Sequence, residues 1–276
     1  PYFSPSNEPG VRMDKVRKIL PIYYRSIFIS DVHLGFAGCN AKYLLSFLRA
    51  TRCDYLYLIG DIIDMWQMKK KLHWPQAHND VIRTILGKAK HGTRIIYVPG
   101  NHDEQLRDFE GIVLGNLEIH NEFIHITKDN KRFLIMHGDK FDGVVRHTNF
   151  LTHIGGIFYR LSLGTSLGMS MVRRKLGFSY WSLAEVVRQK VNGGAKYIDN
   201  FETALAYAAM DYAVDGIISG HIHRPGISRV KDIVCCNCGD WVENCSALVE
   251  RHDGAMELMH WTEGKQEPLN MPGMAA

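Results

Sequence analysis

The sequence predicts an α/β fold, and two observations lead to this prediction. Short apolar runs rich in β-branched and aromatic residues, typical of buried strands, alternate along the chain with amphipathic patterns typical of helices. The 276 residues, 46% hydrophobic and 22% charged, have the composition of an ordinary globular protein that can bury a substantial core. We therefore expect a single domain over residues 1–276.

Five main strands are predicted from short apolar runs. Each of these is a run of three to five apolar residues, and helical patterns lie between them, for example over 43–50 and 80–90. Shorter strand-like pieces follow toward the C-terminal end. The strands are predicted at 27–29, 55–59, 95–98, 133–136 and 216–218, then near 227–230, 233–236, 246–250 and 256–260.

Residues 144–212 interrupt this alternation, because strand patterns vanish there. An amphipathic stripe over 150–161 predicts one helix. A second helix is expected to start at Asp199, whose side chain can form a capping box with Glu202. Its apolar face would hold Phe201, Leu205 and Tyr212. We interpret the stretch as a helical insertion in an otherwise α/β chain.

Each of the five main strands runs into a side chain that can bind a metal ion. In α/β sheets, ligands gather beyond the carboxyl ends of the strands, so these side chains should converge on one site. An isolated histidine is more often an ordinary core or surface residue, but a core has no reason to place a ligand after every strand. The residues delivered in this way are Asp31, His33, Asp61, Asn101, His137, His221 and His223.

The chemistry of these donors indicates which ions they would hold. Carboxylate, carboxamide and imidazole together suit Mn²⁺, Fe or Zn²⁺ better than a thiolate zinc site or a calcium cage. Seven ligands exceed the need of one ion, whereas two ions about 3.5–4 Å apart that share a carboxylate use all of them. We therefore predict two divalent metal ions, with Mn²⁺ as the first choice. Such pairs serve in-line phosphoryl displacement.

Three further carboxylates, Asp64, Asp103 and Asp139, closely follow these strand ends. Two interpretations stay open for them. They would either orient the imidazoles of the metal ligands or cap the helices that come next.

Composition and charge exclude several classes of protein. No window approaches 18 apolar residues and the N-terminal stretch lacks the apolar core of a secretory signal, so we expect a cytoplasmic, non-spanning protein. The crowded cysteines Cys235, Cys236, Cys238 and Cys245 lack CxxC spacing; we interpret them as buried thiols, with a structural zinc as the alternative. The net charge of +4 is small, and nucleic acid is not an expected partner.

The positive charge is concentrated within the insertion. Residues 144–200 contain eight Lys/Arg against two acidic residues, a net charge of +6. This local field suggests an anionic ligand or surface. A solvated basic face over an ordinary core is the simpler interpretation, and an edge that contacts anionic lipid is the alternative. Lys69, Lys70 and Lys71 either overhang the metal site or form a solvated loop.

In this order and at strand ends, the motifs DxH, GDxxD, GNHD, HGD and GHxH resemble those of the calcineurin-like metallophosphoesterases, from Asp31 to His223. The resemblance implies a two-sheet sandwich flanked by helices. It also implies that His102 faces the phosphate and stabilises or protonates it. One metal would be held by Asp31, His33, Asp61 and His223, and the other by Asp61, Asn101, His137 and His221, with Asp61 bridging.

A narrower resemblance rests on GDIIDMW at 60–66, on the insertion before GHIH, and on NCGDW at 237–241. Together they are similar to the UDP-2,3-diacylglucosamine hydrolase family. That resemblance implies cleavage of the pyrophosphate of a lipid-linked nucleotide sugar in lipid A synthesis, giving UMP and a lipid phosphate. Strict members of that family carry Arg at the position of His102, where His is usual in the wider superfamily.

The same resemblance makes the insertion at 144–212 a lid that accommodates acyl chains. We expect Phe158 and Leu161 to contact the chains, Arg173 and Arg174 to bind the anionic part of the substrate, and the protein to sit peripherally on the cytoplasmic face of the inner membrane. The alternative is a soluble nucleotide phosphodiesterase or phosphomonoesterase of the same superfamily. A metal-free binding scaffold is disfavoured, because its ligand set would have gaps and this one has none.

Overall fold

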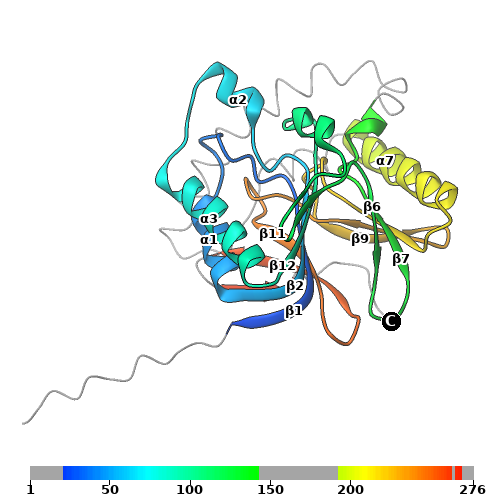
Figure 1. The fold of residues 1–276 in the computed structure, drawn as a ribbon. Helices are drawn as coiled ribbons and strands as arrows, with labels where there is room; N and C mark the ends of the chain where they lie inside the picture. The colour runs from blue at the N-terminus through cyan, green and yellow to red at the C-terminus, as the bar shows by residue number, and fades with distance from the viewer. Residues whose placement is uncertain (1–20, 143–191, 263–264, 269–276) are drawn as a thin grey trace, which may run out of the picture.

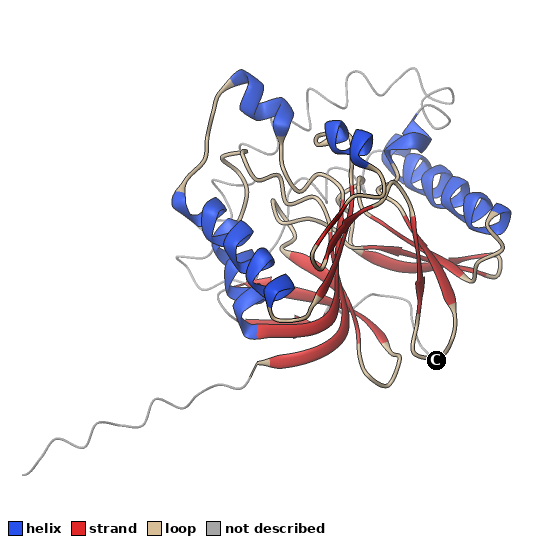
Figure 2. Cartoon of the chain, in the orientation of Figure 1, coloured by secondary structure: helices blue, strands red, loops and turns tan. Residues whose placement is uncertain are grey.

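The computed structural model describes residues 21–142, 192–262 and 265–268. Two facing β-sheets lie between two helical layers, with α1 and α3 outside one sheet and α7 outside the other (Figures 1 and 2). The predicted two-sheet α/β sandwich flanked by helices is therefore confirmed. The first helix predicted in the insertion, together with Phe158, Leu161, Arg173 and Arg174, lies outside the described residues.

The larger sheet has eight strands in the order β13-β12-β11-β1-β2-β3-β5-β4, and the smaller has five in the order β6-β7-β8-β10-β9. In the larger sheet they are β1 (Ile22–Ile29), β2 (Thr51–Ile59), β3 (Arg94–Val98), β4 (Val113–Leu114), β5 (Leu117–Ile119), β11 (Ser246–Glu250), β12 (Met256–Thr262) and β13 (Lys265–Pro268). In the smaller they are β6 (Phe123–Ile126), β7 (Arg132–Ile135), β8 (Gly216–Ser219), β9 (Gly226–Val230) and β10 (Ile233–Asn237). The helices are α1 (Ala41–Ala50), α2 (Met65–Lys70), α3 (Gln76–Lys90) and α7 (Asn192–Asp211), with 3-10 turns η1 (Glu104–Phe109) and η2 (Asp139–Phe141).

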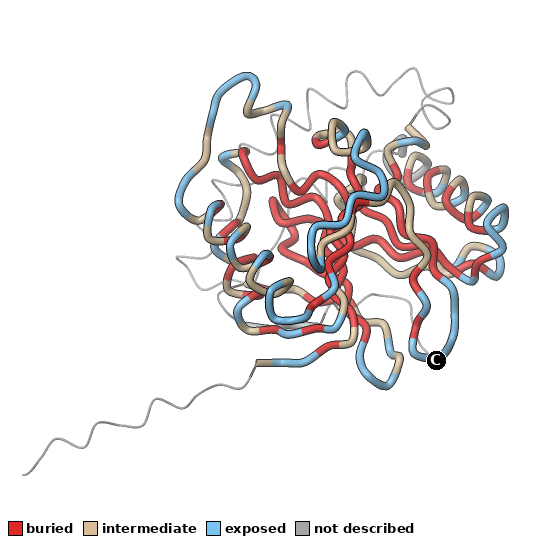
Figure 3. The backbone as a smooth tube through the Cα atoms, viewed as in Figure 1, coloured by how far each residue is buried: buried red, intermediate tan, exposed pale blue. Residues whose placement is uncertain are grey.

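Alternation of side chains along the strands builds three apolar layers. On β1, Ile27 and Ile29 pack toward α1 and α3, while Phe28 packs toward the other sheet. On β7, Ile135 joins the layer between the sheets and Leu134 packs toward α7. Figure 3 shows that the strands of both sheets are mostly buried. Because both faces are covered, these strands are continuous apolar runs in the sequence, which is why they could be predicted.

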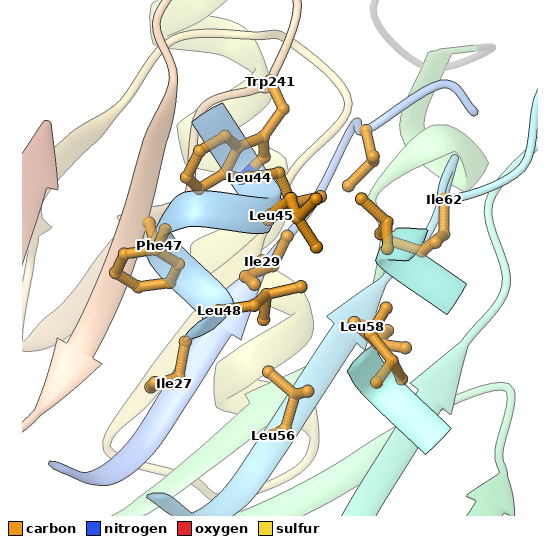
Figure 4. Close-up of a cluster of buried hydrophobic side chains, with 14 of the residues drawn as sticks. Ile27, Ile29, Leu44, Leu45, Phe47, Leu48, Leu56, Leu58, Ile62 and Trp241 are labelled. Carbon is orange, nitrogen blue, oxygen red and sulfur yellow. The ribbon is translucent and has the colours of Figure 1, made fainter. Parts of the chain in front are cut away.

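The layer beneath α1 is built from large aliphatic and aromatic side chains. Figure 4 shows Leu44, Phe47 and Leu48 of α1 lying against the larger sheet. Trp241, which is fully buried, packs its ring 5.5 Å from that of Phe47. The loop between β10 and β11 is therefore anchored in the same core as the strands that carry the predicted ligands.

The relative directions of the strands decide where the predicted ligands meet. β1, β2 and β3 are mutually parallel, and β7 is parallel to β8. The carboxyl ends of each parallel set therefore lie at one edge of their sheet. The loops that follow these five strands contain all seven predicted metal ligands.

Two local predictions are corrected by the structure. The second helix of the insertion does not start at Asp199, because α7 begins at Asn192 and Asp199 lies inside it. The apolar stripe continues through Ile198, which is buried, and Phe201 packs against the smaller sheet, so tertiary packing overrides the capping signal. Tyr212 lies just past the helix and is 43% exposed, so it is not part of the apolar face. The sequence also did not indicate β4, β5, β6 and α2, which are short and partly exposed.

The cysteines behave as ordinary buried thiols, as predicted. Cys235 and Cys236 lie on β10, and Cys238 and Cys245 are buried in the loop that follows it; none of the four forms a disulfide. Burial raises the pKa of Cys235 to about 12. Among the described residues, no cysteine belongs to a group that could hold a metal ion.

Helices of the described segments are all too short or too polar to cross a lipid bilayer.

A buried polar network lies where β1, β11 and the β6–β7 hairpin meet. The carboxylate of Glu250 is fully buried and accepts hydrogen bonds from Arg25 Nη1 at 2.6 and 2.8 Å, Ser26 Oγ at 2.7 Å and the backbone N–H of Lys128 at 2.8 Å. Nε2 of His125 lies 2.9 Å from the same carboxylate. Burial raises the pKa of Glu250, but the hydrogen bonds from His125 and Ser26 bring it from 4.5 down to about 2. Glu250 is thus ionised in the folded protein and links the two sheets.

Replacing Glu250 with Ala is expected to lower the free energy of unfolding at pH 7 by about 3–5 kcal/mol, because it leaves the Arg25 guanidinium partly buried and unpaired. A folded-state pKa below the unfolded value gives stability that is present above about pH 4.5 and is lost as the pH falls toward 2. Urea unfolding of the wild type and the variant should therefore differ most near pH 7 and converge on acidification. Glu257→Ala, which breaks an exposed pair with Arg251, is the control and should cost less than about 1 kcal/mol. An equal loss in both variants would contradict this account.

Candidate metal centre

The predicted ligands occupy backbone positions that ordinary loops avoid. Asp31, His33, Asp61, His221 and His223 all have positive φ angles, between 51° and 71°. The left-handed region is disfavoured for residues with a Cβ and is found at sites that the surrounding structure over-determines. Here the loops after β1 and β2 are held to each other by backbone hydrogen bonds, Asp31 N–H to Gly60 O at 3.1 Å and His33 N–H to Asp61 O at 2.8 Å. The strained backbone thus directs these side chains into one site.

Five of the seven predicted ligands are brought within reach of common ions. In each of three groups of residues, the ligand atoms lie within 4.8 Å of one another. Asp31, His33 and Asp61 each belong to two of these groups. Oδ2 of Asp61 lies 3.5 Å from His137 Nε2 and 3.8 Å from His33 Nε2, so one carboxylate oxygen faces imidazoles from two loops. The three groups are Asp31–His33–His223, His33–Asp61–His102 and Asp31–Asp61–His137.

The outer nitrogens of three of these imidazoles are fixed by oxygen acceptors. Nδ1 of His33 and Nδ1 of His102 lie 3.0 and 2.9 Å from the two oxygens of Asp64. Nδ1 of His137 lies 3.0 Å from the carbonyl oxygen of Ile59. Each contact places the Nδ1 proton outward and leaves the Nε2 lone pair directed toward Asp61.

The structure shows the roles of Asp64 and Asp103, which the sequence left open between orienting imidazoles and capping helices. Asp64 has both roles: it contacts His33 and His102, and it caps α2 by accepting the N–H of Gln67 at 2.8 Å. Asp103 has neither. It is buried, and it accepts the backbone N–H groups of Gly100 and of residues 61–63, together with the Tyr97 hydroxyl at 2.6 Å. It therefore ties the loops after β2 and β3 together.

Asp139 instead accepts a hydrogen bond from the Arg107 guanidinium at 2.8 Å. It contributes a link between η2 and η1 and forms no side-chain cap of η2.

The electrostatics of the cluster favour a cation. Burial raises the pKa of Asp31, but the imidazoles of His223 and His137 bring it down to about 2. Burial also opposes ionisation of Asp61, yet His137 and His33 hold the pKa of its carboxyl well below the usual range. Conversely, burial lowers the pKa of His137, but Asp61 and Asp31 raise it to about 10. The two carboxylates thus favour the anionic form and stabilise positive charge beside them, as a site for a divalent cation requires.

The donor atoms fit a divalent cation. His33 Nε2, His137 Nε2 and Asn101 Oδ1 are buried and make no hydrogen bond. Buried polar groups are almost always satisfied, so buried imidazole nitrogens without a hydrogen bond are typical of a metal site. His33 and His137, whose Nε2 atoms face Asp61, therefore fit a divalent cation.

His221 is placed differently from the other predicted ligands. It is absent from the three groups, and its Nε2 lies 2.7 Å from Asp142 Oδ1. Its ring nevertheless packs against His137, with centroids 5.1 Å apart. His102, predicted to act on the phosphate, lies at the edge of the centre with its Nε2 3.9 Å from Asp61 Oδ2.

Close packing at the strand ends requires glycine. A Cβ on Gly100 would lie 2.3 Å from Oδ1 of Asp61 and 2.7 Å from its backbone N, and a Cβ on Gly60 would lie 2.2 Å from His137 Nδ1. No side chain can be accommodated at either position without moving a predicted ligand. Gly60 and Gly100 are therefore needed for the predicted ligands to pack this closely at the strand ends.

Gly100→Ala is expected to displace Asp61 and to weaken Mn²⁺ binding by roughly tenfold or more, the scale of losses when groups that orient ligands are disturbed. Gly87→Ala is the matched control, because a Cβ there meets nothing within 4 Å and alanine favours the helix by about 1 kcal/mol. Metal analysis after equilibrium dialysis gives the comparison. Unchanged Mn²⁺ binding by a folded Gly100→Ala protein would contradict the tight fit.

Some residues of the centre were missed in the sequence. Asp142 and Tyr197 meet at His221 although 55 residues separate them, and no spacing rule connects them. The ring of Trp66 packs against that of His102, tilted by 32° with centroids 4.4 Å apart, and Asp240 places Oδ2 3.9 Å from His223 Nδ1. Trp66 and Asp240 were indicated in the sequence only as parts of the GDxxDxW and GDW motifs.

Two facing sheets, whose strand ends converge on carboxylates and imidazoles without hydrogen-bond partners, define the class: an α/β protein with a candidate metal centre. The family follows from the sequence match. A family model described as calcineurin-like phosphoesterase matches residues 24–225, well over half of the chain. The chain belongs to the calcineurin-like metallophosphoesterases, and the predicted resemblance is confirmed.

Individual relatives are more distant. The UDP-2,3-diacylglucosamine hydrolase of Haemophilus influenzae is 24% identical over 237 residues, which cover 82% of this chain and 94% of that protein. The enzyme of the same name from Blochmanniella pennsylvanica is 26% identical, with 74% and 81% covered. The DNA polymerase II small subunit of Thermoplasma acidophilum is 23% identical and covers 80% of this chain but only 45% of its own length.

Proposed function

We propose that this protein hydrolyses the pyrophosphate bond of UDP-2,3-diacylglucosamine or a similar lipid-linked nucleotide sugar, giving UMP and a lipid phosphate. The observation that supports phosphoryl chemistry is the position of Asp61, whose Oδ2 faces the Nε2 atoms of His33, His102 and His137 at 3.5–3.9 Å. The choice of substrate is supported by the similarity to UDP-2,3-diacylglucosamine hydrolases over most of the chain.

We propose Mn²⁺ as the ion, held in two positions by Asp31, His33, Asp61 and His223 and by Asp61, Asn101, His137 and His221. Bound divalent ions would polarise the phosphate oxygens and supply a nucleophile from water at neutral pH. Asp64 holds His102 by Nδ1, so its Nε2, when it also carries a proton, can donate to a phosphate oxygen or to the leaving group. Trp66 covers one side of the His102 ring and restricts its rotation.

The experiment that tests the substrate compares UMP release from UDP-2,3-diacylglucosamine and from UDP-N-acetylglucosamine, with Mn²⁺ and with EDTA. Acyl chains bind apart from the reacting phosphate, and their binding energy can be used to orient it. We expect Mn²⁺-dependent turnover of the diacylated compound that exceeds that of the other by at least about a hundredfold in kcat/KM. Comparable rates would instead indicate a soluble nucleotide phosphodiesterase.

For the insertion we propose that Phe158 and Leu161 bind the acyl chains and that Arg173 and Arg174 bind the anionic headgroup. The apolar stripe and the net charge of +6 over 144–200 support this. We also propose a peripheral location at the cytoplasmic face of the inner membrane, where such a substrate would lie. A Phe158→Ser/Leu161→Ser variant, shown to be folded by circular dichroism, should lose at least about tenfold on the lipid substrate and little on bis(p-nitrophenyl) phosphate. Equal losses on both would contradict the proposal.

A further inference from the structure

His221 is held by partners that come from both sides of residues 143–191. Asp142, directly after η2, places Oδ1 2.7 Å from His221 Nε2, and the same oxygen accepts the Tyr197 hydroxyl of α7 at 2.9 Å. The His221 ring also packs against Phe201 of α7, with centroids 6.1 Å apart. The chain entering the insertion and the helix leaving it therefore meet at one predicted metal ligand.

This contact determines which nitrogen of His221 carries the proton. An ionised carboxylate only accepts hydrogen bonds, so Nε2 donates to Asp142 and the lone pair of the neutral ring lies on Nδ1. His33 and His137 are held in the opposite way, because their Nδ1 atoms face Asp64 and the Ile59 carbonyl. The centre would thus take Nε2 from two histidines and Nδ1 from His221.

We propose that Asp142 and Tyr197 are positioning residues of the metal centre, which hold the proton of His221 on Nε2 and thereby present Nδ1 to a divalent cation. The carboxylate–imidazole–metal arrangement fixes ring orientation and makes the imidazole a better ligand. The Tyr197 hydroxyl occupies the same Oδ1 and keeps the carboxylate turned toward His221. This proposal rests on the proposed function only in requiring a centre that binds divalent ions.

The test is a titration of apo-protein with Mn²⁺, followed by the electron paramagnetic resonance signal of the free ion. Asp142→Ala should weaken one of two Mn²⁺ equivalents by about 10–100-fold and leave the other unchanged. Asp142→Asn should recover most of this loss, because its amide oxygen still accepts the Nε2 proton, and Tyr197→Phe should show a smaller loss of a few fold. Asp199→Asn and Tyr212→Phe are matched controls on and beside α7 and should bind both ions normally, since Asp199 is exposed and the Tyr212 hydroxyl bonds Glu122.

A second measurement uses the wild-type protein alone. Long-range ¹H–¹⁵N correlation of the Zn²⁺-loaded protein should show His221 with a metal-bound Nδ1 and a protonated Nε2, and His137 with the reverse. The proposal is overturned by a metal-bound Nε2 on His221, by unchanged binding of both equivalents in Asp142→Ala, or by tighter binding, which would mean that Asp142 competes with the ion. None of these measurements involves a substrate, so they stay informative if UDP-2,3-diacylglucosamine is not hydrolysed.

Discussion

Asp61→Ala should abolish hydrolysis and lower the amount of metal bound per chain, the largest effect that we expect from any single substitution. Oδ2 of Asp61 faces imidazoles from the loops after β1, β3 and β7, and Oδ1 accepts the backbone N–H of His102 at 2.8 Å. Removing the carboxylate therefore takes charge from both predicted ion positions and frees the loop that carries His102. Loss of several kcal/mol of charge stabilisation corresponds to at least about a thousandfold in rate.

The sharper variant is Asp61→Asn, which keeps an oxygen for the His102 N–H and removes only the charge. We expect Asp61→Asn to lose almost as much bound Mn²⁺ as Asp61→Ala does. Asp54→Asn is the matched control, because Asp54 lies on β2, the strand that precedes Asp61, and is exposed beside the Tyr23 hydroxyl. Two ions per chain together with more than about a tenth of the wild-type rate in Asp61→Asn would show that Asp61 does not bridge.

His102→Ala is expected to lower kcat by roughly 10²–10⁴-fold while the protein keeps its full metal content. Nδ1 of His102 is held by Asp64, and one side of its ring is covered by Trp66, so Nε2 is held in a fixed direction and donates a proton from the doubly protonated ring. His102 is also one of the three members of a group that could hold an ion, together with His33 and Asp61. Measuring metal content and kcat on the same preparation separates the two roles.

The control for this substitution is His91→Ala, because His91 is exposed at the end of α3 and bonds only the backbone of its own helix. It should retain wild-type kcat and metal content. If His102→Ala releases an ion, His102 is a ligand and our assignment of its role is wrong. If kcat is unchanged, another group protonates the product.

Much of the fold could be predicted because its strands are covered on both sides. Ile27, Phe28 and Ile29 pack alternately into two different cores, so all three are apolar and the strand is evident in the sequence. The edge strand β4 consists of the exposed residues Val113 and Leu114, and its short pairing with β5 has no pattern of its own. The start of α7 was misplaced because packing of Ile198 outweighs a local capping signal.

By itself, the sequence determined the order of the main strands, the class of the fold and the ligand types at the ends of five strands, because periodicity and side-chain chemistry are local properties. The tertiary structure alone decided that Asp64 serves two imidazoles, that Asp103 ties two loops together and that Asp142 and Tyr197 meet at His221. These contacts join residues 31–79 positions apart. Hydrogen-bond partners at such separations are set by how the layers pack, and packing is a property of the whole chain.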